Sequence, residues 1–99
     1  MTNEDFPALF QFLGAYFHED WMCESNLADE IVNSFINDSA LKTIEVVAKE
    51  IQNLLDLKLS ETVLRDFLLK EIGCSYCYWH EWQSGEQWLR HVAFKLQQP

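Results

Sequence analysis

The sequence predicts an all-α fold, a compact single domain over residues 1–99 with about five helices. Apolar residues recur at intervals of three and four along almost the whole chain, which is the spacing of one helix face. The chain of 99 residues is 48% hydrophobic and includes seven Phe and four Trp, enough for one core and too little for two domains. The stretch "YCYW" has strand propensity, but a lone strand would have no partner.

The first two helices are predicted from their apolar stripes. The first runs from about Pro7, a residue suited to a first helical turn, to about Phe17. Its stripe is Leu9, Phe10, Leu13, Tyr16 and Phe17. The second begins after a cap at Ser25 or Asn26. It turns inward Leu27, Ile31, Val32, Phe35 and Ile36. It turns outward Asp29, Glu30 and Asn33.

The third and fourth helices have the clearest boundaries. Ser39 is the expected cap of the third, which we expect to be the central helix. Its buried face is Leu41, Ile44, Val47, Ala48, Ile51, Leu54 and Leu55. The fourth helix starts at Ser60 and stops at Gly73, a residue that readily adopts the left-handed conformation. Its inward residues are Val63, Leu64, Phe67, Leu68 and Ile72.

The last helix follows the loop "CSYCYWHEWQ", residues 74–83. Ser84 and Gln87 have the spacing of a capping box and predict its start. Its apolar stripe is Trp88, Leu89, Val92, Ala93 and Leu96.

The charge is unevenly distributed along the chain. The formal net charge is -9; residues 1–38 hold eight acidic residues and no Lys or Arg, whereas residues 39–99 hold eight acidic and seven basic residues. Such a surface disfavours contact with a phosphate backbone and attracts a basic protein partner to the N-terminal third. We therefore expect a protein partner and no direct binding of nucleic acid, although solubility alone also accounts for the charge.

The compartment is predicted from what the sequence lacks. No apolar run approaches the ~20 residues needed to cross a bilayer, and the acidic start "MTNEDFP" does not resemble a secretion signal. Three cysteines in such a chain are expected to be reduced. We expect a cytoplasmic protein that does not associate with a membrane.

The segment "GAYFHEDW" combines a histidine, two carboxylates and two large polar aromatics. Adjacent residues of a helix point about 100° apart, so His18, Glu19 and Asp20 are a poor set of metal ligands, and no second acid across a cleft is evident for catalysis. We interpret the segment as a helix end with local hydrogen bonds. Tyr16, Phe17 and Trp21 are assigned mainly to packing; for Tyr16 and Trp21 the alternative is a position at the rim of a protein-binding face. No catalytic residue, resident metal or cofactor is expected.

An alternative function rests on the spacing Cys74-x-x-Cys77-x-x-His80, which is half of a zinc site. Cys23 or His18 would have to complete it. The competing interpretation is that free cysteines act as small buried hydrophobes. The alternative is thus a small metal-binding or redox regulator.

The loop at residues 74–83 carries Tyr76, Tyr78, Trp79 and Trp82, more aromatic surface than a short connection normally hides. Tyr and Trp dominate binding hot spots because they bury large areas with few rotatable bonds. Some of these rings should fill the core, and the others should face a partner.

The segments "FPALFQFLGAYFHEDW" and "GEQWLRHVAFKL" resemble the small immunity proteins of contact-dependent growth inhibition systems, and the likeness spans about Phe6 to Leu96. The resemblance implies a protein that binds and neutralises, in the cytosol, the cognate toxin domain of a large exported protein. Such toxins are often nucleases, and therefore basic. The segment Trp79-His80-Glu81-Trp82 departs from the Tyr- and Pro-rich turn expected in the family.

Charge, aromatic content and resemblance together predict an inhibitor that forms a 1:1 complex through an acidic and aromatic face. The expected toxin-binding residues are Glu19, Asp20, Glu24, Asp29, Glu30, Tyr78, Trp79, Glu81 and Trp82. The acids are expected to speed association, and the aromatic residues to hold the complex.

Overall fold

Five α-helices account for most of the part of the chain that the computed structural model describes, residues 2–23 and 27–97, and no strand occurs there. The α-helices are α1 (Pro7–Tyr16), α2 (Ala28–Asp38), α3 (Leu41–Asp56), α4 (Glu61–Asp66) and α5 (Gly85–Leu96). Short 3-10 turns are η1 (Asn3–Asp5), η2 (Trp21–Cys23) and η4 (Tyr78–His80), and α4 continues into a π-helical turn, η3 (Phe67–Glu71). The predicted all-α fold with five helices is confirmed.

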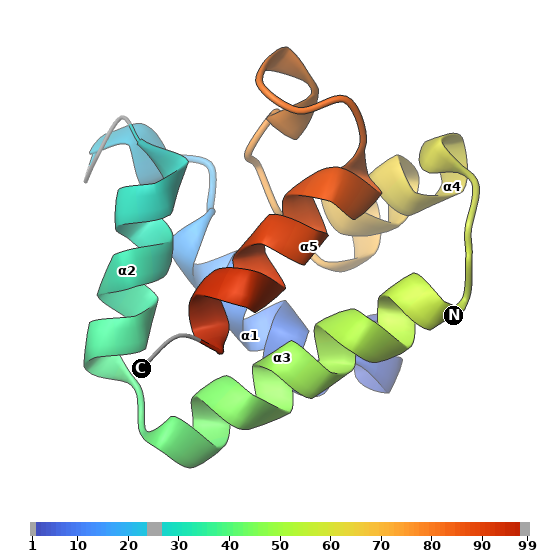
Figure 1. The fold of residues 1–99 in the computed structure, drawn as a ribbon. Coiled ribbons are helices and arrows are strands. Elements are labelled where there is room, and N and C mark those ends of the chain that lie inside the picture. The colour runs from blue at the N-terminus through green and yellow to red at the C-terminus, as the bar shows by residue number, and fades with distance from the viewer. Residues whose placement is uncertain (1, 24–26, 98–99) are drawn as a thin grey trace.

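The longest helix, α3, lies across one side of the molecule, and α1 and α5 both pack on it (Figure 1). α2 and α4 flank α5, and the loop of residues 74–83 rises at the end of the molecule opposite α3. The buried apolar residues of all five helices form one continuous cluster. The prediction that the third helix is central is wrong, because α5 packs on α3, α4 and α2, whereas α3 packs mainly on α1 and α5. None of the described helices is long and apolar enough to cross a membrane.

The apolar stripes are confirmed for most of α3 and all of α5, and wrong at four positions. Phe10, Leu27, Leu41 and Val63 are exposed, with relative exposures of 39%, 56%, 70% and 47%. Leu27 precedes α2, Leu41 is the first residue of α3, and Val63 lies in the first turn of α4. On α1 the buried position belongs instead to Phe12, whose ring stacks on Phe35 with centroids 4.1 Å apart.

Helix caps depend on both local and distant residues. Ser60 and Ser84 cap α4 and α5 as predicted, each hydroxyl accepting a backbone N–H three residues later. The expected cap at Ser39 is wrong by one residue, because Ala40 precedes α3. The α2 cap position is Leu27, which makes no side-chain cap, while Ser25 and Asn26 lie outside the described residues.

The first turn of α1 is capped from another helix. The Glu50 carboxylate on α3 accepts the backbone N–H groups of Ala8 (3.3 Å) and Leu9 (2.9 Å). A carboxylate at a helix N-terminus satisfies otherwise unpaired donors and interacts favourably with the helix dipole. This contact fixes α1 on α3. No local sequence pattern predicts it, because Glu50 is more than 40 residues from Ala8 and Leu9.

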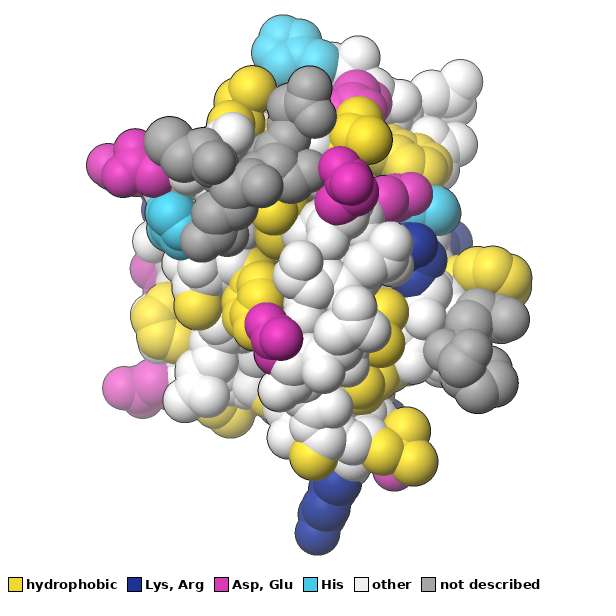
Figure 2. Space-filling model, turned by 90° about the vertical axis from the view of Figure 1, so that its left-hand side faces the viewer, with side chains coloured by type: hydrophobic (Ala, Val, Ile, Leu, Met, Phe, Trp, Pro, Cys, Tyr) yellow, Lys and Arg dark blue, Asp and Glu magenta, His cyan; other side chains and the backbone are white. Residues whose placement is uncertain are grey.

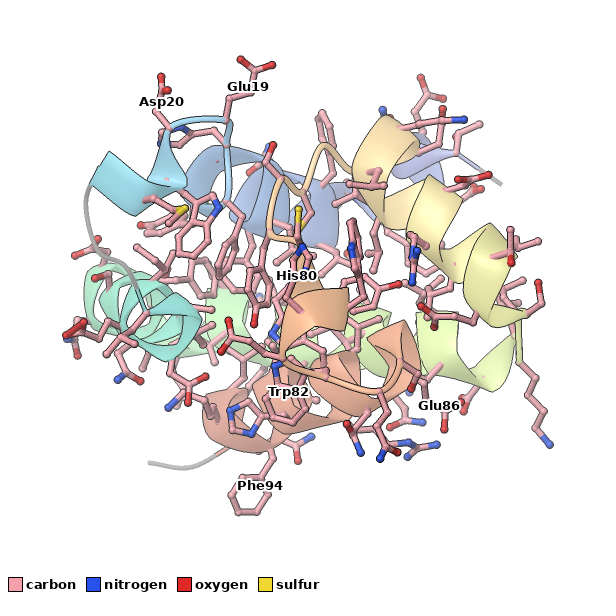
Figure 3. The ribbon with its side chains drawn as sticks, turned by 90° about the horizontal axis from the view of Figure 1, so that it is seen from above. Glu19, Asp20, His80, Trp82, Glu86 and Phe94 are labelled. Atoms are coloured by element: carbon pink, nitrogen blue, oxygen red, sulfur yellow. The ribbon has the colours of Figure 1, made fainter. Side chains whose placement is uncertain are left out.

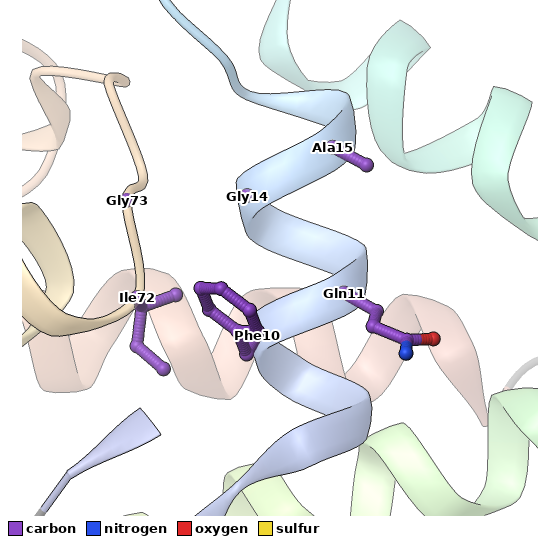
Figure 4. Close-up of a pocket in the computed structure, with 6 residues that line it drawn as sticks. All are labelled: Phe10, Gln11, Gly14, Ala15, Ile72 and Gly73. Atoms are coloured by element: carbon purple, nitrogen blue, oxygen red, sulfur yellow. The ribbon is translucent and has the colours of Figure 1, made fainter. Parts of the chain in front are cut away.

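A tight turn against α1 precedes the loop of residues 74–83, which we call the aromatic loop. Gly73 has a φ of +77°, the left-handed stop predicted after the fourth helix. The turn approaches α1 at Gly14, where a Cβ would lie 3.0 Å from the Ile72 carbonyl oxygen (Figure 4). The Ser75 N–H then donates to the Phe17 carbonyl (2.7 Å). The loop is thereby anchored to the end of α1.

Candidate functional site

The segment "GAYFHEDW" ends α1 with local hydrogen bonds. His18 Nδ1 accepts the Asp20 N–H (3.1 Å), and the His18 carbonyl accepts the Trp21 N–H (3.0 Å). Phe17 and Trp21 are buried, and Tyr16 is half-buried with its hydroxyl donating to Asp38 (3.1 Å). The interpretation of this segment as a packed helix end is confirmed.

The acidic residues of this segment lie apart from the aromatic loop. Glu19 and Asp20 are exposed and point outward beyond the end of α1, away from Trp82 (Figure 3). Glu24, also expected to contact a partner, lies outside the described residues. Glu19 and Asp20 thus contribute negative field at a distance from the aromatic residues.

The aromatic loop divides into rings that fill the core and rings that reach the surface. Tyr76 and Tyr78 are buried, whereas Trp79 and Trp82 are half-buried. Tyr78 is 1% exposed and lies parallel to the Trp88 ring at a centroid distance of 6.0 Å. The expectation that Tyr78 anchors a partner is corrected here, because its ring presents no contact surface.

Tyr78 is held in the core by a carboxylate from α4. Its hydroxyl donates to Glu61, which also accepts the Gly85 N–H (2.8 Å) at the start of α5. A Cβ on Gly85 would lie 3.0 Å from the Tyr78 oxygen, so glycine permits this close approach. Burial, with the hydrogen bond to Glu61, raises the pKa of Tyr78 to about 12. Glu61 therefore joins α4, the aromatic loop and α5.

Trp79 is partly covered by the chain itself. The Arg65 guanidinium lies 4.3 Å from the centroid of its ring, a cation–π contact. The other edge of the ring meets Tyr78 at a centroid distance of 5.2 Å. Trp79 thus offers less free surface than the sequence suggests.

The structure brings three of the expected residues together around one hollow. Asp29 of α2 lies with Glu81 and Trp82 of the loop at a surface cavity of about 200 Å³. Its lining is completed by Leu27, Ala28 and Tyr76. We call this cavity the α2–loop hollow. Its lining comes both from the acidic N-terminal part of the chain and from the aromatic loop.

Hydrogen bonds and ring contacts fix the walls of the α2–loop hollow. The Tyr76 hydroxyl donates to Glu81 (2.9 Å), and burial together with this carboxylate raises the pKa of Tyr76 well above its ordinary value. His91 Nε2 lies 2.9 and 3.1 Å from the two Asp29 oxygens, and the His91 ring lies under Trp82 with centroids 4.8 Å apart. Sequence reasoning missed His91, since 62 residues separate it from Asp29 and no motif links them.

Acidic side chains are prominent on the side of the molecule that carries α2. Asp and Glu side chains are spread over this face, several of them in its upper part, whereas Lys and Arg appear mainly at its right edge and lower end (Figure 2). Glu30 is exposed next to Asp29 in the first turn of α2. Leu27, directly before α2, adds exposed apolar surface, with 56% of its area accessible. Such a mixture of acidic and apolar groups suits a basic protein partner.

The cysteine motif does not form a metal site in the described part of the chain. Cys74 is buried, and burial raises the pKa of its thiol to about 12, which disfavours the thiolate that ligates metals. Cys77 and His80 are exposed. Among the described residues, no group of three or more His, Cys, Asp or Glu side chains is placed to hold a metal ion. The Cys23 side chain lies outside this description.

The raised pKa values of Tyr76 and Tyr78 predict alkaline destabilisation. An unfolded tyrosine ionises near pH 10, whereas both phenols stay protonated to higher pH in the folded state. Their contribution to stability is complete below pH 10 and is lost as the pH rises toward and through 12, at up to about 1.4 kcal/mol per pH unit for each group. Urea unfolding at steps from pH 8 to 11.5 measures the decline. Tyr78→Phe should make the free energy of unfolding fall less steeply with pH. An unaltered slope would contradict the assignment of this decline to the Tyr78 phenol.

Comparison with known proteins identifies the family. The family model described as CdiI immunity protein matches residues 5–96. A chain in the crystal structure of a CdiA-CT/CdiI complex from Y. kristensenii 33638 is similar at 33% identity, over 97% of each chain, with a TM-score of 0.92. A search of curated proteins gave no match. As the resemblance of its first and last helices implied, the chain belongs to the CdiI immunity protein family.

Proposed function

We propose that this protein binds the toxin domain of its own contact-dependent growth inhibition system in the cytoplasm and neutralises it in a 1:1 complex, without enzymatic activity. The observation that supports this most directly is the likeness, along 97% of both chains, to a chain from a CdiA-CT/CdiI complex. The match of the family model over residues 5–96 supports the same role. An inhibitor of this kind needs surface complementarity and no reactive centre.

The proposed toxin-binding face centres on the α2–loop hollow. Asp29, Glu81 and Trp82 meet there, and Glu30 lies exposed beside it. We place Trp79 at the margin of this face, because it does not line the hollow. Glu19, Asp20 and Glu24 are assigned to long-range attraction, because the first two are exposed and point away from Trp82. Tyr78 is removed from the face and assigned to its support.

The proposed toxin is a basic domain, and a nuclease is the class that best explains the acidic face. Residues 1–38 carry eight acidic side chains and no Lys or Arg. A protein that acts on nucleic acid needs positive charge around its active site, and an acidic inhibitor meets that charge. We propose that the inhibitor covers this basic surface.

The test is calorimetry with the toxin domain encoded beside the gene, at low and high salt, with the toxin's activity assayed in parallel. We expect tight 1:1 binding that weakens with salt, and residual toxin activity that falls in proportion to the inhibitor added. No binding to a folded toxin domain would overturn the proposal. Complete inactivation by a small fraction of an equivalent would instead indicate an enzyme.

A further inference from the structure

We propose that the α2–loop hollow receives one basic side chain, an arginine or a lysine, from the toxin. The inference rests on the proposed function, because the occupant comes from that partner. It goes further in assigning a single anchoring contact to a defined cavity. The rest of the acidic surface then serves mainly to attract the toxin.

The hollow contains the groups that a basic side chain requires. Asp29 and Glu81 place two carboxylates at its wall, one from α2 and one from the loop. Leu27, Tyr76 and Trp82 supply apolar and aromatic surface for the alkyl part of the side chain. A cation held between a carboxylate and an aromatic ring gains a charge-assisted hydrogen bond and a cation–π contact. An anion would be repelled, and an apolar side chain would take water away from both carboxylates without offering either of them a hydrogen bond.

The walls of the hollow are fixed before any partner arrives. The Tyr76 hydroxyl holds Glu81 at 2.9 Å, and His91 holds both oxygens of Asp29 within 3.1 Å. The same His91 ring supports Trp82. Fixed acceptors lose little conformational entropy on binding, so the contact should be strong for its size. The exposed Glu19 and Asp20 point into solvent away from Trp82 and form no such enclosure.

The aromatic loop already binds one arginine in this way. The Arg65 guanidinium lies 4.3 Å from the Trp79 ring centroid and 3.7 Å from the Glu61 carboxylate. The α2–loop hollow repeats this combination of Trp and carboxylate at Trp82 and Glu81, but in the described part of the chain no Lys or Arg lines it. The toxin would supply the missing cation.

The experiment measures dissociation of the toxin from Glu81→Gln and Trp82→Leu variants by surface plasmon resonance. Gln retains an oxygen that accepts the Tyr76 hydroxyl, so the variant should remain folded, which thermal denaturation followed by circular dichroism checks. We expect the dissociation rate to rise about tenfold or more for each variant. Glu45→Gln on α3, which removes the same charge from an exposed site outside the hollow, is the matched control and should dissociate at the wild-type rate.

A second measurement identifies the occupant. Each Arg and Lys of the toxin is replaced by Gln and combined with Glu81→Gln in a double-mutant cycle. One toxin position should show strong coupling to Glu81, and the others should be additive. Tight wild-type binding with an unchanged dissociation rate for Glu81→Gln, or with no coupled toxin position, would overturn the inference and leave the proposed function intact. If the wild-type protein does not bind the toxin, the proposed function and this inference are both overturned.

Discussion

Reversing both acidic charges in the first turn of α2, with Asp29→Lys and Glu30→Lys, is expected to slow association with the toxin about tenfold or more at low salt. Both side chains are exposed, and they belong to the segment of residues 1–38 that carries no Lys or Arg. Attraction between opposite surface charges raises association rates well above those of neutral surfaces. The variant puts two positive charges where a basic toxin domain should first meet the inhibitor.

Stopped-flow association at low and high salt measures this effect. The difference between variant and wild type should shrink at high salt, because ions screen exposed charges beyond about 10 Å at 0.1 M. Glu45→Lys with Asp56→Lys is the matched control. It changes the net charge equally on α3, which lies at the opposite end of the molecule from the loop, and should slow association much less (Figure 1). Equal association rates for both variants would contradict steering by α2.

The helices could be predicted because their signals are local. A stripe such as that of α3 needs only the spacing of apolar residues, and the caps at Ser60 and Ser84 need only a hydroxyl near the first turn. Prediction failed where the outcome depends on a distant contact. Leu41 fits the α3 stripe yet is 70% exposed, and the spacing of apolar residues does not tell whether another element covers that position.

The chemistry of the candidate site could be predicted, but not its assembly. The acidic N-terminal part and the aromatic loop are both evident in the sequence. That Asp29 shares a hollow with Glu81 and Trp82 depends on how α2 and the loop pack, and no local pattern encodes that arrangement. The same limit explains Tyr78, since its burial depends on the hydrogen bond to Glu61 from a different helix.

Replacing Glu61 with alanine is expected to lower the free energy of unfolding by about 2–4 kcal/mol. The substitution removes the acceptor of two donors, the Tyr78 hydroxyl and the Gly85 N–H. Each buried donor left without a partner costs about 1–3 kcal/mol. The pairing with Arg65 at 3.7 Å adds little, because that ion pair is partly exposed.

Urea unfolding of Glu61→Ala, Tyr78→Phe and the double variant tests this account. The cost of Glu61→Ala should be smaller in the Tyr78→Phe background, because one of the two donors is already gone. Glu45→Ala, at an exposed site on α3, is the control and should change stability by less than about 0.5 kcal/mol. If Glu61→Ala changed stability as little as this control, the claim that Glu61 joins the loop to the core would be contradicted. If the claim holds, Glu61→Ala should also release the toxin faster, although Glu61 does not line the hollow. The reason is that the backbone N–H groups of Glu81 and Trp82 donate to the Tyr78 carbonyl, and the Tyr78 hydroxyl is held by Glu61.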